Sequence, residues 1–355
     1  MDFKPISVLM GMIILVAACA NPSSGTTPTL PGTRSLSVMT HDSFAVSEDV
    51  IADFESQNNV KVQFLKAGDA GTALNKAILS RENPLADVFY GVDNTFLSRA
   101  LNEDIFEPYD APGLADIPDE FKLDSLKRAL PIDYGDVCLN YDKTFFEDKN
   151  IPAPQSLEDL LKPAYKGLLV VENPATSSPG LSFLLTSIGH FGPQAYLNYW
   201  KSLVANEVEV VNDWETAYYT EFSGSSGRGP RPIVVSYDSS PAFEVIYAAT
   251  KIDEPPTAAI VSDDTCFRQI EFVGILKGTQ NRDLAEKWID FMLSPRFQED
   301  MPLQMFVFPV NPKASLDAAF VKYLELPEKT AYVSPQDIAA HREQWIQEWT
   351  DAVLR

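Results

Sequence analysis

The sequence predicts an α/β protein built as two lobes, and three observations lead to this prediction. From Leu36 to about residue 100, short apolar strands alternate with amphipathic helices. A longer strand then begins near Asp133, and a second alternating series follows it. The chain has 355 residues, which is too many for one ordinary hydrophobic core. Such alternation is typical of a parallel sheet with helices on both faces.

The first series supplies candidate ligand residues in its loops. We predict strands at 36–40, 60–67 and 86–93, and helices at 47–57, 71–81 and 95–101. The loops at the carboxyl ends of parallel strands form the ligand crevice in such sheets. Two of these loops carry short polar side chains, Asp42 and Ser43 in one and Asp93 and Asn94 in the other.

The second series contains a stretch with two interpretations, "ENPATSSPGLSFLL" at 172–185. We predict strands at 133–140, 167–174, 208–211, 231–237 and 266–278, and helices from Pro179 and at 196–206, 214–222, 282–295 and 333–354. The hydroxyl of Ser177 or Ser178 could cap the helix, with Pro179 as its first residue. Alternatively, these hydroxyls and the free N–H groups of the helix N-terminus could bind polar or negative ligand atoms.

The amino-terminal segment predicts export and a lipid anchor. Lys4 precedes a short apolar region, and the following "VAAC" resembles a bacterial lipobox with Cys19 as the acylated residue. We therefore expect a signal peptide at 1–18 and a lipidated flexible tether at 19–35, which would hold the protein on a membrane surface. An ordinary secretory signal and a lone membrane anchor are the alternatives. The net charge of −22 argues against nucleic acid as a partner.

Two further cysteines, Cys138 and Cys266, remain in the exported part of the chain. Disulfides persist outside the cytoplasm, and an even number of cysteines favours a bridge between them. Two separate buried thiols are the alternative. Cysteines so far apart do not form a zinc site, and we expect neither a metal nor a cofactor.

Enzyme motifs are absent from the sequence. There is no G-x-S-x-G elbow and no H-E-x-x-H, and the three histidines show no catalytic spacing. The glycine-rich stretch at 223–232 lacks the pattern of a phosphate-binding loop. We expect a binding protein rather than an enzyme, and a secreted hydrolase is the less favoured alternative.

A binding function uses many more of the residues. The loops offer Asp42, Ser43, Asp93, Asn94, Ser177, Ser178, Tyr237, Ser239 and Ser240, and the predicted helix at 214–222 adds the aromatic faces of Trp214, Tyr218 and Tyr219. Carboxylates and aromatic faces together are suited to a flat organic cation. Each residue also has an ordinary structural role open to it, as a helix cap or as part of the core.

Several segments resemble the thiamine-binding substrate-binding proteins of ABC transporters. They are "THDSFAVSEDVIADFE", "ADVFYGVDNTFL", "DYGDVCLNYDK", "ENPATSSPGLSFLL", "DWETAYYTEF", "VVSYDSSPAFEVIYA" and "QEDMPLQMFVFPVN". The resemblance runs in order from about Leu36 to the C-terminus. It implies a periplasmic-binding-protein-like fold in which hinge strands join two lobes and the ligand lies between them. It also implies a monomer that binds thiamine or its phosphates without changing them chemically and delivers them to a membrane permease.

The resemblance extends to individual residues. It implies ligand contacts from Asp42, Ser43, Asp93, Asn94, Ser177, Ser178, Trp214, Tyr218 and Tyr237. Ser239 of the loop after the predicted strand at 231–237 and Phe306 complete the set of residues that we expect to contact the ligand. Enteric members of the family carry tyrosine where His41 stands and tryptophan where Phe306 stands. Iron-binding relatives use adjacent tyrosines where only Tyr237 is found here, so ferric ion is a less favoured ligand, and a polyamine is another cation to consider.

The resemblance also suggests where the two lobes begin and end. We expect the first lobe to comprise 36–137 and 264–308, and the second to comprise 138–263 and 309–355. Cys138 and Cys266 would then lie in the connecting strands, close together at the hinge.

Overall fold

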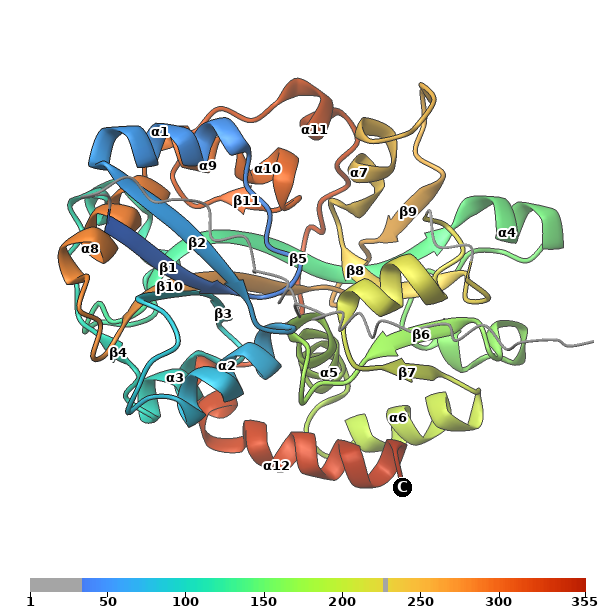
Figure 1. The fold of residues 1–355 in the computed structure, drawn as a ribbon. Helices are drawn as coiled ribbons and strands as arrows, with labels where there is room; N and C mark the ends of the chain where they lie inside the picture. Colours follow the sequence, from blue (N-terminus) through green and yellow to red (C-terminus); the bar gives the residue numbers. More distant parts are fainter. Residues whose placement is uncertain (1–33, 226–228) are drawn as a thin grey trace, which may run out of the picture. The chain divides into compact units, whose positions relative to one another are not determined.

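The computed structural model describes residues 34–225 and 229–355, and a mixed sheet of eleven strands runs through this part of the chain (Figure 1). The strands are β1 (Arg34–Thr40), β2 (Val60–Lys66), β3 (Val88–Asp93), β4 (Phe106–Glu107), β5 (Leu130–Asp142), β6 (Leu169–Glu172), β7 (Glu209–Val211), β8 (Ile233–Tyr237), β9 (Thr257–Ile260), β10 (Phe267–Leu276) and β11 (Phe308–Pro309). Their main order is β2-β1-β3-β10-β5-β8-β6-β7.

Two parallel groups of strands are joined through antiparallel ones. On one side β1 pairs in parallel with β2 and β3, and on the other β6 pairs in parallel with β7 and β8. The long strands β5 and β10 lie between these groups and are antiparallel to their neighbours. The predicted α/β class is confirmed, and the sheet is mixed because these connecting strands reverse its direction.

Helices cover the strands and extend the core. They are α1 (Glu48–Asn58), α2 (Ala70–Leu79), α3 (Leu97–Asn102), α4 (Lys143–Lys149), α5 (Ser178–Phe191), α6 (Tyr196–Ala205), α7 (Ser240–Ile246), α8 (Arg282–Met292), α9 (Pro295–Gln298), α10 (Met301–Gln304), α11 (Ala318–Lys322) and α12 (Pro335–Val353). Short 3₁₀ turns are η1 (Pro112–Asp116), η2 (Asp119–Phe121), η3 (Asp159–Leu161) and η4 (Pro163–Tyr165). The segment η5 (Thr216–Glu221), predicted within an α-helix, is a π-helix.

Helix ends show where local sequence signals hold and where they fail. The helix α12 begins as predicted, with Pro335 first and the Ser334 hydroxyl accepting the Asp337 N–H. At α5 the expected hydroxyl cap is wrong. Ser177 occupies the capping position but makes no side-chain capping bond, and the Ser178 hydroxyl donates instead to Asp93. The Ser178 hydroxyl is therefore used in a contact with a distant strand rather than as a local cap.

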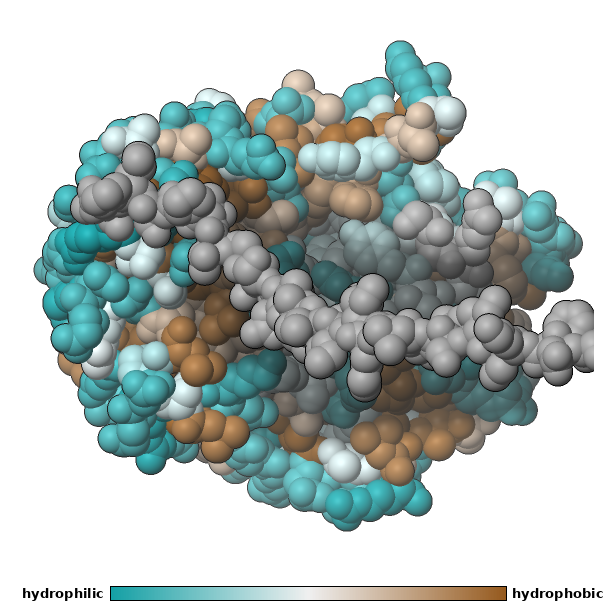
Figure 2. All heavy atoms as spheres, viewed as in Figure 1, coloured by the Kyte–Doolittle hydropathy of each residue, from teal (hydrophilic) through white to brown (hydrophobic). Residues whose placement is uncertain are grey.

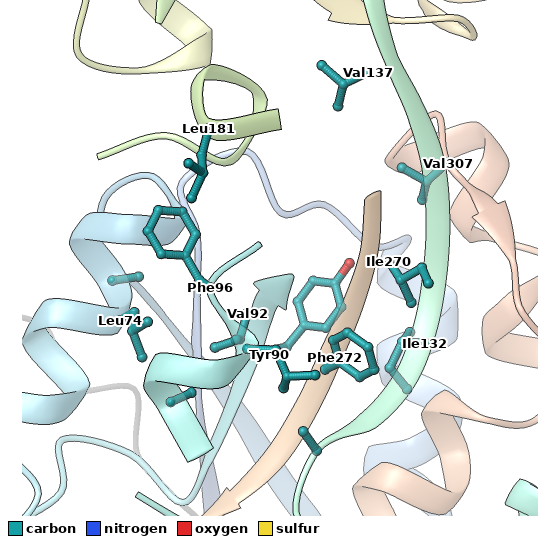
Figure 3. Packing of buried hydrophobic residues seen from close by; sticks show 14 of the residues in the cluster. Leu74, Tyr90, Val92, Phe96, Ile132, Val137, Leu181, Ile270, Phe272 and Val307 are labelled. Carbon is teal, nitrogen blue, oxygen red and sulfur yellow. The ribbon is translucent and has the colours of Figure 1, made fainter. Parts of the chain in front are cut away.

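The hydrophobic core is continuous between the two strand groups. Figure 3 shows Phe96 beside Leu181 of α5, and Tyr90 reaching from β3 towards Ile270 and Ile132 on the connecting strands. Each such side chain, once buried, contributes about 1.5–3 kcal/mol to stability. The cavity described below is therefore built on a rigid, well-packed base.

The connecting strands also bring the two cysteines together. Phe267 of β10 pairs with Val137 of β5, so Cys266 and Cys138 are neighbours across the ladder. The structure joins them as a disulfide with Cα atoms 4.3 Å apart, which is close to the short end of the usual range.

No helix in the described ranges is both long enough and apolar enough to cross a membrane. Figure 2 shows hydrophilic residues over much of α1 and a recess beside α7. Cys19 and the predicted signal peptide and tether, apart from Arg34 and Ser35, lie outside the described residues.

Candidate functional site

A cavity lies among the ends of the sheet strands and the helices that follow them. Its lining comprises His41, Ser43, Asp69, Ala70, Ser178, Pro179, Trp214, Tyr218, Tyr219, Tyr237, Ser240, Phe243, Gln269, Glu271, Gln304, Met305, Phe306 and Val307. Both parallel strand groups and the connecting strand β10 contribute to it, as expected for a site between lobes.

One wall is a stack of aromatic rings. The rings of Trp214 and Tyr218 are nearly parallel, with centroids 5.1 Å apart, and Tyr219 meets Trp214 edge to face. The polar ends of the two stacked rings are anchored, because the Trp214 indole donates to the Ser236 hydroxyl at 3.0 Å and the Tyr218 hydroxyl donates to Glu244 at 2.8 Å. The stack is therefore held in place before any ligand arrives.

A second aromatic wall centres on Phe306. Its backbone has a φ of 55°, in the left-handed region that a bulky residue rarely adopts. The Phe306 carbonyl accepts the hydroxyl of Ser239, and its ring meets Phe243 edge-on at 4.5 Å. Strained backbone of this kind is concentrated at functional sites. Ser239, which the sequence predicts as a ligand contact, thus shapes the wall from behind.

Asp69 places a carboxylate beside the aromatic stack. It caps α2, and its oxygens accept the N–H groups of Ala70 at 2.7 Å and of Trp214 at 3.1 Å. Burial raises the pKa of Asp69 to about 6, although the hydrogen bonds to its oxygens act to lower it. The carboxyl group is therefore ionised at neutral pH. Asp69 was not among the residues predicted from the sequence, although it follows β2 as Asp42 follows β1, so its strand-end position was the signal for it.

The other end of the cavity is lined by His41, Gln269 and Glu271. The Gln269 amide donates to the Tyr237 hydroxyl at 3.0 Å, and His41 Nε2 lies 3.4 Å from Glu271 Oε1. Burial lowers the pKa of His41 to about 4, so it is neutral, and burial together with the nearby Asp133 raises the pKa of Glu271 well above its usual value. Gln269 and Glu271 were not predicted as site residues. The sequence signal for them was two polar residues, two positions apart, in a mostly apolar strand pattern.

The structure divides the predicted site residues into two groups. Six of them line the cavity, namely Ser43, Ser178, Trp214, Tyr218, Tyr237 and Phe306. The other five lie behind the lining, namely Asp42, Asp93, Asn94, Ser177 and Ser239.

The residues behind the lining hold its loops in position. Asp42 accepts the N–H of Gly68, and Asp93 accepts the N–H of Thr95 and the hydroxyl of Ser178. The Asn94 side chain donates to the carbonyl of Arg268 and accepts the N–H of Ile270, which ties the end of β3 to β10. The hydroxyl of Ser177 faces Asp69 and lowers the pKa of that carboxyl.

Comparison with known proteins places the chain in a family. Residues 83–339 match the model of the bacterial extracellular solute-binding proteins. The chain belongs to this family. Its members bind solutes and are not enzymes, so the expectation of a binding protein rather than an enzyme is confirmed.

Individual solute-binding proteins resemble the chain over most of its length. A thiamine-binding periplasmic protein of Salmonella typhimurium is 32% identical over 90% of this chain and 94% of its own. One from Brucella suis is 30% identical over 93% and 96%. The solved structure of a periplasmic thiamin binding protein superposes with a TM-score of 0.78 at 28% identity, covering 91% of this chain and 97% of the other. These relatives confirm the resemblance predicted from the sequence and the two-lobed fold class.

Proposed function

We propose that this solute-binding protein captures thiamine or a thiamine phosphate outside the cytoplasm and delivers it to the permease of an ABC importer. The names of its relatives support this ligand. The observation that carries the proposal is the pairing of the Trp214–Tyr218 stack with the carboxylate of Asp69 in one cavity.

Thiamine matches both parts of this arrangement. Its thiazolium ring is a flat heteroaromatic cation, and the negative face of an aromatic ring attracts a cation within about 6 Å by roughly 0.5–2 kcal/mol. Asp69 adds an ionised group that is only partly exposed to water, where charges interact more strongly than in bulk solvent. Anchored rings lose little conformational entropy when the ligand binds.

The alternative cations fit the cavity less well. The turn at which iron-binding relatives carry adjacent tyrosines has only Tyr237 here, followed by Asp238. Within residues 34–225 and 229–355, no group of three histidine, cysteine, aspartate or glutamate side chains could hold a metal ion. A polyamine is flexible and has no flat face to place on the stacked rings.

We further propose that the protein acts as a monomer held at the membrane by a lipid on Cys19. The "VAAC" sequence and the polar stretch after it support the anchor. The lobe boundaries at 36–137 with 264–308, and at 138–263 with 309–355, remain part of this proposal. Mass spectrometry of the protein from membranes would detect a diacylglyceryl group on Cys19, and an unmodified cysteine would contradict the anchor.

Calorimetry with a panel of ligands tests the proposed function. Purified protein should bind thiamine, its monophosphate or its diphosphate more tightly than spermidine or ferric citrate. Binding should also quench tryptophan fluorescence, and the quenching should be much smaller in Trp214→Phe. Tight ferric binding with a visible tyrosinate band, and no binding of thiamine or its phosphates, would overturn the proposal.

A further inference from the structure

Three polar side chains meet beneath the cavity on adjacent strands. The hydroxyl of Tyr90 on β3 lies 2.6 Å from Asp133 Oδ2 on β5 and 3.1 Å from Glu271 Oε2 on β10. Asp133 and Glu271 are direct partners in the antiparallel ladder between these two strands. Figure 3 shows the Tyr90 ring extending from β3 towards the connecting strands. All three side chains are buried.

Counting hydrogens in this cluster shows that one of the two carboxyl groups must carry a proton for both contacts with Tyr90 to be favourable. A phenol has one hydrogen to donate, and the shorter contact assigns it to Asp133. The contact between Tyr90 and Glu271 is then favourable when Glu271 carries a proton on Oε2 and donates it to the phenol oxygen. The result is a chain of donation from Glu271 to Tyr90 to Asp133, and it leaves Glu271 Oε1 as a carbonyl-type acceptor.

The surroundings of Glu271 supply no positive charge to compensate an ionised carboxylate. The groups that face it are Asp133 from β5, Tyr90 and Asp93 from β3, Tyr237 from β8 and His41 from the loop after β1. His41 is neutral because burial lowers its pKa to about 4. Among the described residues, no lysine or arginine forms an ion pair with Glu271 or Asp133. Two ionised carboxylates side by side here would repel each other without water to screen them.

The same end of the cavity contains buried polar atoms with unused hydrogen-bonding capacity. Gln269 Oε1 and His41 Nε2 have no hydrogen-bond partner, and both residues line the cavity with Glu271. Gln269 and Glu271 are two residues apart on β10, so their side chains lie on the same face of the strand. Leaving a buried polar group unpaired is unfavourable. A ligand N–H that donates to Gln269 Oε1 would remove this penalty at that atom.

We propose that Glu271 determines ligand specificity as a neutral carboxylic acid, and that its Oε1 and Gln269 Oε1 together accept an uncharged amino group on the ligand's heteroaromatic ring. This inference rests on the proposed function, since the aminopyrimidine of thiamine carries such a group. The cavity then has two functions at separate places: Asp69 compensates the positive charge, and the end formed by Gln269 and Glu271 recognises the amine. An ammonium group would be disfavoured there, because neutral oxygens supply no compensating charge.

Glu271→Gln and Glu271→Ala separate a neutral acid from an ionised one. Glutamine reproduces the protonated side chain, since its amide N–H can donate to Tyr90 while its oxygen still accepts. By calorimetry at pH 7, Glu271→Gln should keep thiamine affinity within about threefold of the wild type, and Glu271→Ala should lose about tenfold or more. The exposed Glu82→Gln is the matched control and should bind as the wild type does. If Glu271→Gln loses as much affinity as Glu271→Ala, Glu271 is an ionised counter-charge and the inference is overturned.

Two further measurements do not depend on the alanine variant folding. The infrared difference spectrum between the ligand-free wild type and Glu271→Gln at pH 7 should contain the C=O stretch of a protonated carboxyl, which isolates Glu271 from the other buried carboxyls such as Glu172 and Asp238. A thiamine analogue with hydrogen in place of the ring amino group should bind the wild type about tenfold more weakly than thiamine does. Absence of the infrared band, or equal affinity for the analogue, would overturn the inference. If wild-type protein binds no form of thiamine, the proposed function fails and this inference falls with it.

Discussion

The rings of Trp214 and Tyr218 lie 16° from parallel with centroids 5.1 Å apart, and the backbone N–H of Trp214 donates to Asp69 Oδ2. One residue therefore supplies an aromatic face and also fixes the nearest carboxylate. The indole N–H is used separately, in its bond to Ser236. Removing the ring would leave the backbone bond to Asp69 in place, so the contributions of ring and charge can be measured independently.

The first prediction concerns this ring. Trp214→Ala should weaken thiamine binding by about 0.5–2 kcal/mol, because the cation loses one aromatic face. Trp214→Phe keeps a face and should recover most of the affinity. Isothermal titration calorimetry measures both, with urea unfolding as a check on stability. Wild-type affinity in Trp214→Ala would assign the indole to the core rather than to the ligand.

The second prediction is a pH dependence that arises from Asp69. Its pKa is raised from 3.8 to about 6 in the folded protein, so the carboxylate becomes neutral as the pH falls through 6. Thiamine affinity should therefore decrease between pH 7 and pH 5 in the wild type. Asp69→Asn should bind thiamine about tenfold more weakly than the wild type at pH 7. Its thiamine affinity should also no longer decrease between pH 7 and pH 5 through titration of residue 69.

Folding stability should respond to Asp69 in the opposite direction. A carboxyl whose folded pKa is raised stabilises the fold when protonated, and this contribution is lost as the pH rises from about 4 through 6. Asp69→Asn has no such loss and should be at least as stable as the wild type at pH 7 in urea unfolding. A variant that loses affinity and stability together would show that Asp69 acts through the fold alone.

The fold was largely predictable from the sequence because its elements are short and strongly patterned. Alternating strands and helices predicted both strand groups, and the Ser334–Pro335 signal placed the start of α12 correctly. The absence of a hydroxyl cap at Ser177 could not be predicted, because the Ser177 hydroxyl faces Asp69 and the Ser178 hydroxyl donates to Asp93, and both carboxylates are distant in sequence. Local rules fail where distant groups compete for the hydroxyls that could cap a helix.

The site was predictable in part, for a similar reason. The aromatic residues Trp214, Tyr218 and Tyr237 were identified from the predicted loops and helix and again from the resemblance, and they line the cavity. Strand-end position alone does not distinguish a side chain that faces a ligand from one that holds a loop. Asp42 turns to the N–H of Gly68, whereas Asp69 enters the cavity. Which carboxylate does so depends on how the two strand groups meet, and this is a property of the tertiary structure.

The third prediction concerns contact between α2 and the loop before α5. The Gly71 N–H donates to the Thr176 carbonyl at 3.0 Å, and a Cβ at residue 71 would lie 2.9 Å from the carbonyl oxygens of Ala175 and Thr176. Gly71→Ala should push this loop away and weaken thiamine binding, although residue 71 is not among the cavity-lining residues. Overpacking of this kind typically costs about 1–3 kcal/mol.

Small-angle scattering shows whether this loss reflects impaired closure. Two lobes joined by strands should close around the ligand like a hinge, so the radius of gyration should fall when thiamine binds. Gly71→Ala should reduce this change, whereas the exposed Lys76→Ala on the same helix should not. An unchanged radius in fully occupied wild-type protein would contradict closure.

The last prediction concerns Cys138 and Cys266, which the structure joins across 128 residues of sequence. Both are buried on the connecting strands and neither lines the cavity. Closing so long a loop stabilises the fold by up to ~4–5 kcal/mol in the chain-entropy model. Reduction under partly denaturing conditions should therefore lower the free energy of unfolding and leave thiamine affinity nearly unchanged. The double variant Cys138→Ala/Cys266→Ala is the control, since reductant should not affect it. Mass spectrometry of non-reduced peptides should recover the two cysteines linked, and free alkylatable thiols from oxidised protein would rule the bridge out.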